Sequence, residues 1–449
     1  MDTPTLSVIG LGKLGTPMLV CLASRGFNVI GLDVNQRSLD LLREGRSPVA
    51  EPQVEDLLRA HGQRIRLTGD FEDAVGQSEI SFVVVPTPSE ADGTFSLRHV
   101  QAACERIGDA LGVKKGFHLV VITSTVLAQD METVVLPTLA RRSGKACGSD
   151  FGVCYNPEFI ALGSVVRDML HPDFILIGES DPRSGALLES VHKRVVGDQV
   201  PVVRTTFVNT ELAKIAVNTF VTTKISYANM LAEVCERIPG CDVDVVTSAI
   251  GLDSRIGPKY LKGRLGYGGP CFPRDNIAFS ALARKHEVSA TLAEATDAVN
   301  RRQITRLVDR VRELVPPGRA VGILGLAYKQ NTDVVDESQG VQLAGQLAAS
   351  GVPVTVYDPL AMATARQVLG DAVRYAATAD ECVRESDVVV IATPWEEFKQ
   401  LQMPSLAHNP RRVVVDCWRL LDAQRVRQVA DYMTVGIALP SVSHAAIPR

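Results

Sequence analysis

The chain has 449 residues, more than one compact core normally holds, so we expect two or three domains. Apolar residues make up 46% and charged residues 22%, which is the balance of an ordinary soluble globular protein. The net charge of -4 provides no basic field of the kind that nucleic-acid binding needs, but it is compatible with a local cationic pocket for a phosphorylated substrate.

The nine cysteines are scattered and show neither paired CxxC motifs nor Cys/His ligand spacing. This pattern predicts reduced thiols in a cytoplasm and no metal site. The N-terminus enters a strand pattern without a basic targeting region, and no apolar stretch is long enough to span a bilayer. We therefore expect a cytoplasmic protein that binds neither a membrane nor nucleic acid.

A dinucleotide-binding signature opens the chain. A short apolar run at residues 6–9 predicts a strand, and the helical pattern of residues 18–23 follows a GxGxxG motif. Gly10 permits the turn, Gly12 lets a pyrophosphate approach the backbone, and Gly15 lets the helix pack against the strand. The N–H groups at the start of the helix would face the phosphates.

A second predicted strand, residues 28–33, ends in Asp33 at the distance from the glycines that is typical of a ribose-binding carboxylate. A carboxylate there accepts hydrogen bonds from ribose hydroxyls and repels a 2′-phosphate, so we expect NAD rather than NADP as the cofactor. A strand-to-helix turn without a ligand is the alternative, and the ordered strand, helix and acid favour the cofactor site.

Two further predicted strands, residues 80–85 and 118–122, run into segments that contain Thr87 and Thr125. In an open parallel sheet, ligands bind beyond the carboxyl ends of the strands. Both threonines are therefore candidates to line a cofactor and substrate cleft, with a capping hydroxyl as the alternative.

A long and mainly helical stretch follows, at residues 208–312. Its first helix carries Lys214 and Asn218 on one face, because they are four positions apart. They are candidates to point together into a cleft between domains, and a solvated surface is the alternative. The apolar run at residues 225–231 of the same helix favours self-association.

The segment around Cys271 has the features of a nucleophile. Gly268 and Gly269 would let backbone and substrate approach closely, and Pro270 fixes the entry to the thiol. Asp275 would share a face with the thiol in a helix. A buried structural cysteine is the alternative interpretation.

The C-terminal third repeats the strand pattern of the first third, at residues 320–326, 354–358 and 388–394. A second doubly wound domain is therefore expected. It lacks the full glycine fingerprint, so a mononucleotide or the base of a nucleotide sugar is its expected ligand rather than a second dinucleotide. Lys329 is a candidate to reach a phosphate, and a solvated lysine is the alternative.

Taken in order, these motifs resemble the UDP-glucose/GDP-mannose dehydrogenase family along almost the whole chain. Further shared motifs are Glu51-Pro52, Ser124-Thr125-Val126, Asn156-Pro157-Glu158-Phe159 and Gly325-Leu326-Ala327-Tyr328-Lys329. The resemblance implies an α/β fold in which two Rossmann-like doubly wound domains are joined by a long helix and a helical dimerisation domain. The implied boundaries are 1–204 for an NAD-binding domain, 205–312 for the dimerisation domain with Cys271, and 313–449 for a domain that binds the nucleotide sugar.

The resemblance also implies a reaction, the four-electron oxidation of the C6 alcohol of a nucleotide sugar with NAD as the acceptor. Cys271 would attack the intermediate aldehyde to form a thiohemiacetal, whose oxidation gives a thioester that water hydrolyses. An unperturbed thiol has a pKa of about 8.5, so a nearby cation such as Lys214 would raise the thiolate share. Lys214 and Asn218 would stabilise oxyanions, and the enzyme would be a homodimer or a higher homo-oligomer.

The remaining roles follow from matching family positions. Asp275, Thr125 and Glu158 would position the water used in proton transfer and hydrolysis. Residues expected to contact the cofactor are Gly10, Gly12, Lys13, Leu14, Gly15, Asp33, Thr87 and Thr125. Residues expected to contact the substrate are Phe159, Lys214, Asn218, Arg255, Lys262, Tyr267, Gly268 and Lys329, with Arg255 acting across the dimer.

The chain departs from the family pattern at three places. Leu162 stands where the family often has a second acid, Lys13-Leu14 replaces an aromatic-Val pair, and Asp336 replaces the usual Arg after the Lys329 loop. The acid at 336 places a charge of the wrong sign near the nucleotide or a domain contact. We expect UDP-glucose to be oxidised to UDP-glucuronate; GDP-mannose or another nucleotide hexose, a two-electron 3-hydroxyacid dehydrogenase and a non-catalytic nucleotide-sugar sensor are the alternatives.

Overall fold

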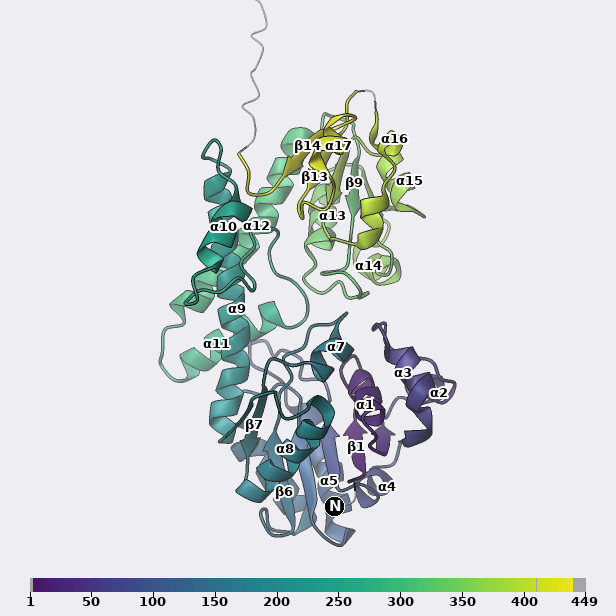
Figure 1. Ribbon diagram of the computed structural model, residues 1–449, viewed down its shortest axis with the longest axis vertical. Coiled ribbons are helices and arrows are strands. Elements are labelled where there is room, and N and C mark those ends of the chain that lie inside the picture. The colour runs from purple at the N-terminus through teal and green to yellow at the C-terminus, as the bar shows by residue number, and fades with distance from the viewer. Residues whose placement is uncertain (1–2, 409, 439–449) are drawn as a thin grey trace, which may run out of the picture. The chain divides into compact units, whose positions relative to one another are not determined.

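The computed structural model of the protein describes residues 3–408 and 410–438. The chain divides into two compact units, Met1–Val217 with Ala281–Val288, and Asn218–Ser280 with Ser289–Arg449 (Figure 1). Two helices, α9 (Phe207–Cys235) and α11 (Phe272–Lys285), contribute residues to both units.

The first unit is built on an eight-stranded sheet with the order β3-β2-β1-β4-β5-β6-β7-β8, in which β6 and β7 are the one antiparallel pair. Its strands are β1 (Leu6–Ile9), β2 (Val29–Leu32), β3 (Ile65–Thr68), β4 (Ile80–Val83), β5 (His118–Ile122), β6 (Phe151–Tyr155), β7 (Ile175–Glu179) and β8 (Val202–Thr205). The central strands are mostly apolar and are buried along their whole length, as expected for parallel strands covered on both faces. Their polar residues Ser7, Ser81 and His118 are hydrogen-bonded to one another.

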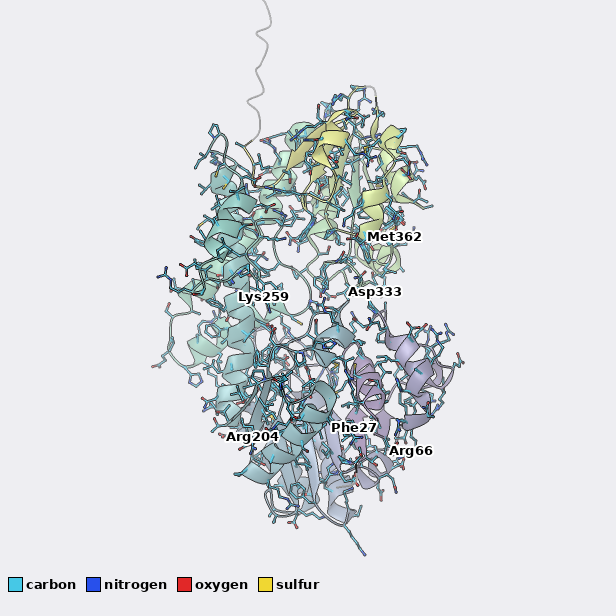
Figure 2. The ribbon with its side chains drawn as sticks, viewed as in Figure 1. Phe27, Arg66, Arg204, Lys259, Asp333 and Met362 are labelled. Atoms are coloured by element: carbon cyan, nitrogen blue, oxygen red, sulfur yellow. The ribbon has the colours of Figure 1, made fainter. Side chains whose placement is uncertain are left out.

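Helices cover both faces of this sheet. They are α1 (Gly15–Ser24), α2 (Gln36–Arg43), α3 (Val54–His61), η1 (Gly62–Arg64), α4 (Phe71–Gly76), α5 (Arg98–Val113), η2 (Met131–Val135), α6 (Leu136–Ser143), α7 (Val165–Leu170) and α8 (Pro182–Val196). Alternate strand residues enter two different cores: Val8 packs in one and Ile9 in the other. Phe27, labelled in Figure 2, lies in the first of these cores, with the Arg194 guanidinium 5.1 Å from its ring centroid.

The second unit combines helices with a six-stranded, wholly parallel sheet of order β11-β10-β9-β12-β13-β14. Its strands are β9 (Val321–Leu324), β10 (Val354–Tyr357), β11 (Arg374–Tyr375), β12 (Val388–Ile391), β13 (Val413–Asp416) and β14 (Asp431–Thr434). Its further helices are α10 (Val243–Gly251), α12 (Thr291–Leu314), α13 (Gln339–Ala349), α14 (Met362–Leu369), α15 (Ala379–Arg384), η3 (Glu396–Gln400), α16 (Met403–Leu406) and α17 (Ala423–Arg427).

The expected α/β fold with two Rossmann-like sheets and a helical region between them in sequence is confirmed. The domain boundaries after residues 204 and 312 stay predictions. Within the described part of the chain, none of the helices has both the length and the apolar character that crossing a membrane requires.

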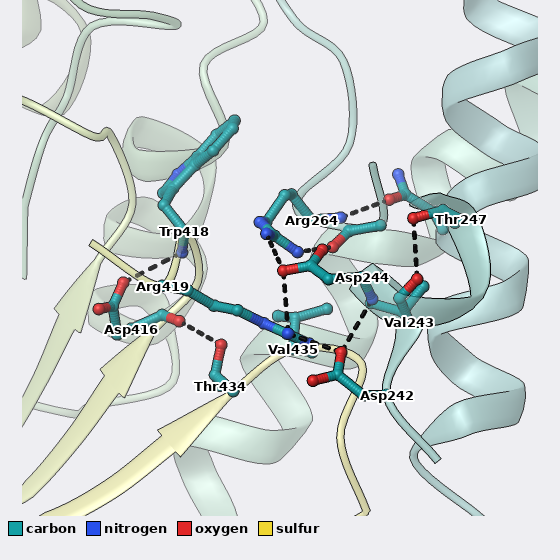
Figure 3. Close-up of polar contacts among 12 residues, drawn as sticks. Asp242, Val243, Asp244, Thr247, Arg264, Asp416, Trp418, Arg419, Thr434 and Val435 are labelled. Carbon is teal, nitrogen blue, oxygen red and sulfur yellow. Dashed lines mark hydrogen bonds and ion pairs between the residues drawn. The ribbon is translucent and has the colours of Figure 1, made fainter. Parts of the chain in front are cut away.

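An ion-pair network joins the helical region of the second unit to its sheet (Figure 3). Arg419, three residues beyond β13, pairs with Asp242 at 2.6 Å and Asp244 at 2.9 Å, and Arg264 pairs with Asp244 at 2.7 Å. Beside it, the amide of Val243 donates to the carbonyl of Gly436 at 3.0 Å. Because Arg264 lies shortly before Cys271, the network anchors the segment that leads into this cysteine to the C-terminal sheet.

Asp358 occupies the same place after β10 that Asp33 occupies after β2, but its carboxylate is buried with 1% exposure. Its five donors, at 2.7–3.0 Å, are the amides of Leu326, Ala327, Leu360 and Ala361 and the indole N–H of Trp395. With five donors already bound, this carboxylate has few lone pairs left to accept hydrogen bonds from ribose hydroxyls. This supports the expectation that the second sheet does not bind a second dinucleotide.

We predict that Asp358→Asn lowers the unfolding temperature by several degrees. The amide nitrogen of Asn cannot accept, and each buried donor left without an acceptor costs roughly 1–3 kcal/mol. Thermal unfolding followed by circular dichroism measures the effect, and Asp371→Asn at an exposed position is the control. Equal unfolding temperatures for Asp358→Asn and the wild type would contradict the assigned role.

Candidate active site

The glycine turn after β1 fits the phosphates of a dinucleotide. Gly10 has a φ of +95°, and a Cβ on it would lie 2.3 Å from the carbonyl oxygen of Val84. A Cβ on Gly15 would lie 1.8 Å from the Gly10 carbonyl oxygen, so helix and strand touch there. A Cβ on Gly12 would instead enter open space, which leaves room for a ligand phosphate beside the backbone.

Helix α1 offers its N-terminus to an anion. No acidic residue lies in its first turn, and its N-cap residue Leu14 makes no side-chain capping bond. The exposed Lys13 lies next to this end and adds positive charge. The positive end of the helix dipole favours a bound phosphate at this position.

Asp33 is held beside the same turn. Its carboxylate accepts from the amide of Leu11 at 2.6 Å and from the amide of Asn35 at 2.7 Å, and the side chain is half-buried. Remaining lone pairs can accept from ribose hydroxyls. The residues around the glycine turn therefore fit NAD.

Three predicted site residues follow neighbouring parallel strands, so they lie at the same edge of the first sheet. Thr87 follows β4, Thr125 follows β5 and Glu158 follows β6. The hydroxyl of Ser124 donates to the Val85 carbonyl at 2.7 Å and accepts from its amide at 2.9 Å. This pair of bonds ties the segments beyond β4 and β5 together.

Lys214 of α9 points at the segment after β6. Its Nζ donates to the carbonyl oxygen of Glu158 at 2.6 Å and lies 4.9 Å from the ring centroid of Phe159. The lysine is 8% exposed, so the alternative of a solvated surface lysine is wrong. Burial raises the pKa of Glu158 to about 7, and the charge of Lys214 opposes that rise.

In the second unit, Asn218 and Asp275 are in direct contact. The Nδ2 of Asn218 donates to Oδ2 of Asp275 at 2.6 Å, and both side chains are buried, with 8% and 1% exposure. The Nε of Arg274 lies 3.5 Å from the other carboxylate oxygen. The solvated alternative for Asn218 is therefore wrong as well.

Cys271 lies at the N-terminus of α11, where its carbonyl accepts from the amide of Asp275 at 2.8 Å. Among the cysteines of the described residues, it is the one that is exposed. The alternative of a buried structural cysteine is therefore wrong. The positive end of the helix dipole next to the thiol favours its anion.

The glycines before the thiol are packed against protein. A Cβ on Gly268 would lie 2.3 Å from the Glu337 carbonyl oxygen, and one on Gly269 would lie 2.5 Å from the Tyr328 ring. The Gly269 amide donates to the Asp336 carbonyl at 2.9 Å. We expected these glycines to let backbone and substrate approach closely. The backbone approach is observed, from the 328–337 loop after β9, in which Asp336 makes a contact within the unit. A contact of Gly268 with substrate stays a prediction.

The other predicted substrate residues differ in exposure. Arg255 is exposed and pairs with Asp253 at 2.6 Å, Lys262 is exposed, and Lys329 is half-buried. Tyr267 is 5% exposed, and burial raises the pKa of its phenol. Their contacts with a substrate stay predictions.

The predicted catalytic residues fall into two sets. The first unit contains Thr125, Glu158 and Lys214, and the second contains Asn218, Cys271 and Asp275. Lys214 and Asn218 lie one turn apart on the continuous helix α9, so a single element carries one member of each set. Among the described residues, no group of three or more His, Cys, Asp or Glu side chains is arranged to hold a metal ion.

Comparison with known proteins decides which family these features belong to. Residues 4–196, 208–302 and 322–423 match the NAD binding domain, the central domain and the UDP binding domain of the UDP-glucose/GDP-mannose dehydrogenase family. The chain belongs to this family. The resemblance drawn from the motifs is confirmed, and so is NAD as the cofactor.

Individual relatives match over most of their length. The UDP-glucose 6-dehydrogenase of Haloferax volcanii is 35% identical over 93% of this chain and 97% of its own. The GDP-mannose 6-dehydrogenase of Pseudomonas aeruginosa is 34% identical over 79% of this chain and 80% of its own. A UDP-glucose dehydrogenase structure from Pyrobaculum islandicum superimposes with a TM-score of 0.89 at 36% identity, covering 97% of this chain and 98% of that one.

We predict that Glu158→Gln changes how stability depends on pH. The folded protein keeps a proton on Glu158 that the unfolded chain releases, so wild-type stability falls as pH rises from about 4.5 to about 7. Glu158→Gln has no carboxyl at this position, so its stability does not fall with pH for this reason. Its unfolding temperature minus that of the wild type should therefore become more positive between about pH 5 and about pH 8, as measured by differential scanning fluorimetry.

Glu211 does not affect this comparison. Burial raises its pKa to about 7 as well, but Glu211 is present in both proteins, so its contribution cancels when the two unfolding temperatures are subtracted. A difference that stays constant over this pH range would show that Glu158 is ionised in the folded protein.

Proposed function

We propose that this protein oxidises the C6 alcohol of a nucleotide sugar to the carboxylate, and that UDP-glucose is its substrate and UDP-glucuronate its product. The observation that carries the proposal is the exposed Cys271 at the start of α11, one turn before the buried Asp275 that Asn218 binds. Membership of a family of nucleotide-sugar dehydrogenases supports the reaction class.

The choice of UDP-glucose rests on overall similarity. The UDP-glucose dehydrogenases of Haloferax volcanii and Pyrobaculum islandicum are 35% and 36% identical to this chain, and the second superimposes with a TM-score of 0.89. A GDP-mannose dehydrogenase structure from Pseudomonas aeruginosa also matches over nearly its whole length, but at 30% identity and a TM-score of 0.54. GDP-mannose is therefore the second candidate substrate, and the acid at position 336 is a reason to test it.

The thiol allows the aldehyde stage to be retained. When bound, NAD accepts one hydride in each of the two oxidations. The Cys271 thiolate adds to the aldehyde carbon and forms a C–S bond, and oxidation of this thiohemiacetal gives a thioester. Water then adds to the thioester carbon, and the C–S bond breaks to release the acid and the thiol.

The other predicted catalytic residues stabilise charge and transfer protons. Lys214 and Asn218 present N–H donors to the oxyanions that form at the reacting carbon. Asp275 and Glu158, with Thr125, hold the water and move its proton. A carboxyl with a pKa of about 7, such as that of Glu158, exchanges a proton readily near neutral pH.

We also propose that the chain forms a homodimer through α9. Phe220, Tyr227, Met230 and Val234 are 66%, 47%, 41% and 47% exposed. Their spacing places them on one side of the helix. A row of exposed large apolar residues on a helix is typical of a protein interface.

The reaction predicts two equivalents of NADH for each nucleotide sugar consumed. Purified protein is mixed with limiting UDP-glucose, GDP-mannose or another nucleotide hexose, and NADH absorbance is followed to completion. UDP-glucose should be oxidised fastest. One NADH per substrate would instead indicate a two-electron dehydrogenase, and no turnover with any nucleotide sugar would indicate a binding protein.

Cys271→Ser is the matched variant for this assay. It should form no net acid, because a serine hydroxyl cannot provide the thioester, while calorimetry should show nucleotide-sugar binding close to that of the wild type. Unchanged acid formation by this variant would rule out the thioester route.

For the interface, we predict that Phe220→Glu shifts the protein from dimer to monomer. The substitution removes the apolar area that Phe220 buries in the contact, and it places in the contact a carboxylate that must lose its water. Light scattering after size exclusion measures the mass. Leu360→Glu, at an apolar side chain that is 48% exposed in the C-terminal sheet region, is the control, and a dimer in both variants would refute the proposed face.

A further inference from the structure

The segment that leads into Cys271 is mostly buried although it has no regular secondary structure. Leu261, Leu265 and Tyr267 are 4%, 6% and 5% exposed, and residues 261–271 contain neither helix nor strand. The N–H and C=O groups of such a segment need hydrogen-bond partners, because an unpaired buried group is costly. Two asparagines from different helices provide several of these partners.

Asn229 of α9 binds the first part of the segment. Its Oδ1 accepts from the amide of Arg264 at 2.8 Å, and its Nδ2 donates to the carbonyl of Leu265 at 3.1 Å. The asparagine is 1% exposed. Its amide group therefore acts on this backbone as a neighbouring strand would.

Asn300 of α12 binds the segment closer to the thiol. Its Oδ1 accepts from the Tyr267 amide at 2.7 Å, and its Nδ2 donates to the Tyr267 carbonyl at 2.9 Å. Asn300 is 8% exposed. The Tyr267 ring packs edge-on against Phe272, the residue after Cys271, with 6.3 Å between centroids.

We propose that Asn229 and Asn300 are positioning residues for Cys271. They act through the backbone of residues 264–267 and keep the thiol at the N-terminus of α11. This rests on the proposed function of Cys271 as the nucleophile. The alternative is that the two asparagines contribute stability alone.

Asn300→Ala tests the proposal, with Gln303→Ala as the matched control. Gln303 lies one turn further along α12 and is 5% exposed, but its Nε2 donates to Glu233 at 2.8 Å and not to residues 261–271. Both variants remove the hydrogen bonds of a buried side-chain amide on the same helix. A purely structural role predicts the same behaviour for both.

Two measurements distinguish a role in positioning the Cys271 thiol from a role in stability alone. We expect Asn300→Ala to lower kcat by roughly 10- to 100-fold relative to Gln303→Ala, with the KM for NAD unchanged, because a misplaced nucleophile slows chemistry without affecting cofactor binding. We also expect iodoacetamide to alkylate Cys271 roughly tenfold more slowly, since the thiol leaves the helix N-terminus that favours its anion. Mass spectrometry of the peptide that contains Cys271 measures the second rate.

The proposal is overturned if both readouts for Asn300→Ala lie within about twofold of those for Gln303→Ala, since misplacing a reacting group slows a reaction by far more than twofold. If Asn300→Ala does not fold, Asn300→Asp retains the acceptor for the Tyr267 amide and removes the donor, and the same criteria apply to it. Alkylation does not depend on turnover. A wild-type protein without dehydrogenase activity would therefore refute the proposed function, while the alkylation rates would still decide the role of Asn300.

Discussion

The arrangement of the predicted catalytic residues of the second unit depends on the hydrogen bond between Asn218 and Asp275. Asp275 is 1% exposed, and a carboxylate removed from water in this way needs polar partners. Asn218 provides one at 2.6 Å. Because Asp275 lies in the first turn of α11, the bond holds the helix start that carries Cys271 against α9. Lys214, the cation predicted for the site, lies one turn earlier on the same helix.

The sequence predicts most of the fold and the composition of the site, but not the partners of its residues. Apolar runs locate the buried parallel strands, and the helical stretch expected from residue 208 begins with α9, Phe207–Cys235. Glycines before a thiol look the same in sequence whether substrate or protein approaches them, so the contact of Gly269 with Asp336 could not be foreseen. Asn300 was missed because one asparagine in a polar helix gives no signal of burial.

The two Rossmann-like halves keep the same tight strand-to-helix packing. A Cβ on Gly15 would lie 1.8 Å from the carbonyl oxygen of Gly10, and a Cβ on Gly340 would lie 2.1 Å from that of Gly325. In both halves the helix therefore approaches the end of the first strand through a glycine. Since this packing is common to both, it does not by itself distinguish the half that binds NAD.

What differs between the halves is the use of the acid after the second strand and of the loop after the first. Asp33 binds two amides and stays half-buried, whereas Asp358 is enclosed by five donors. In the second half, the connection from strand to helix is long, residues 325–338, and the Asp336 carbonyl in it accepts from Gly269. In the first half, the loop after the first strand lies in the part of the chain that matches an NAD binding domain. In the second half, the corresponding loop supports the segment that leads into Cys271. A substitution in the 325–338 loop can thus change the position of the Cys271 thiol through the backbone of Gly269, without contacting a ligand itself.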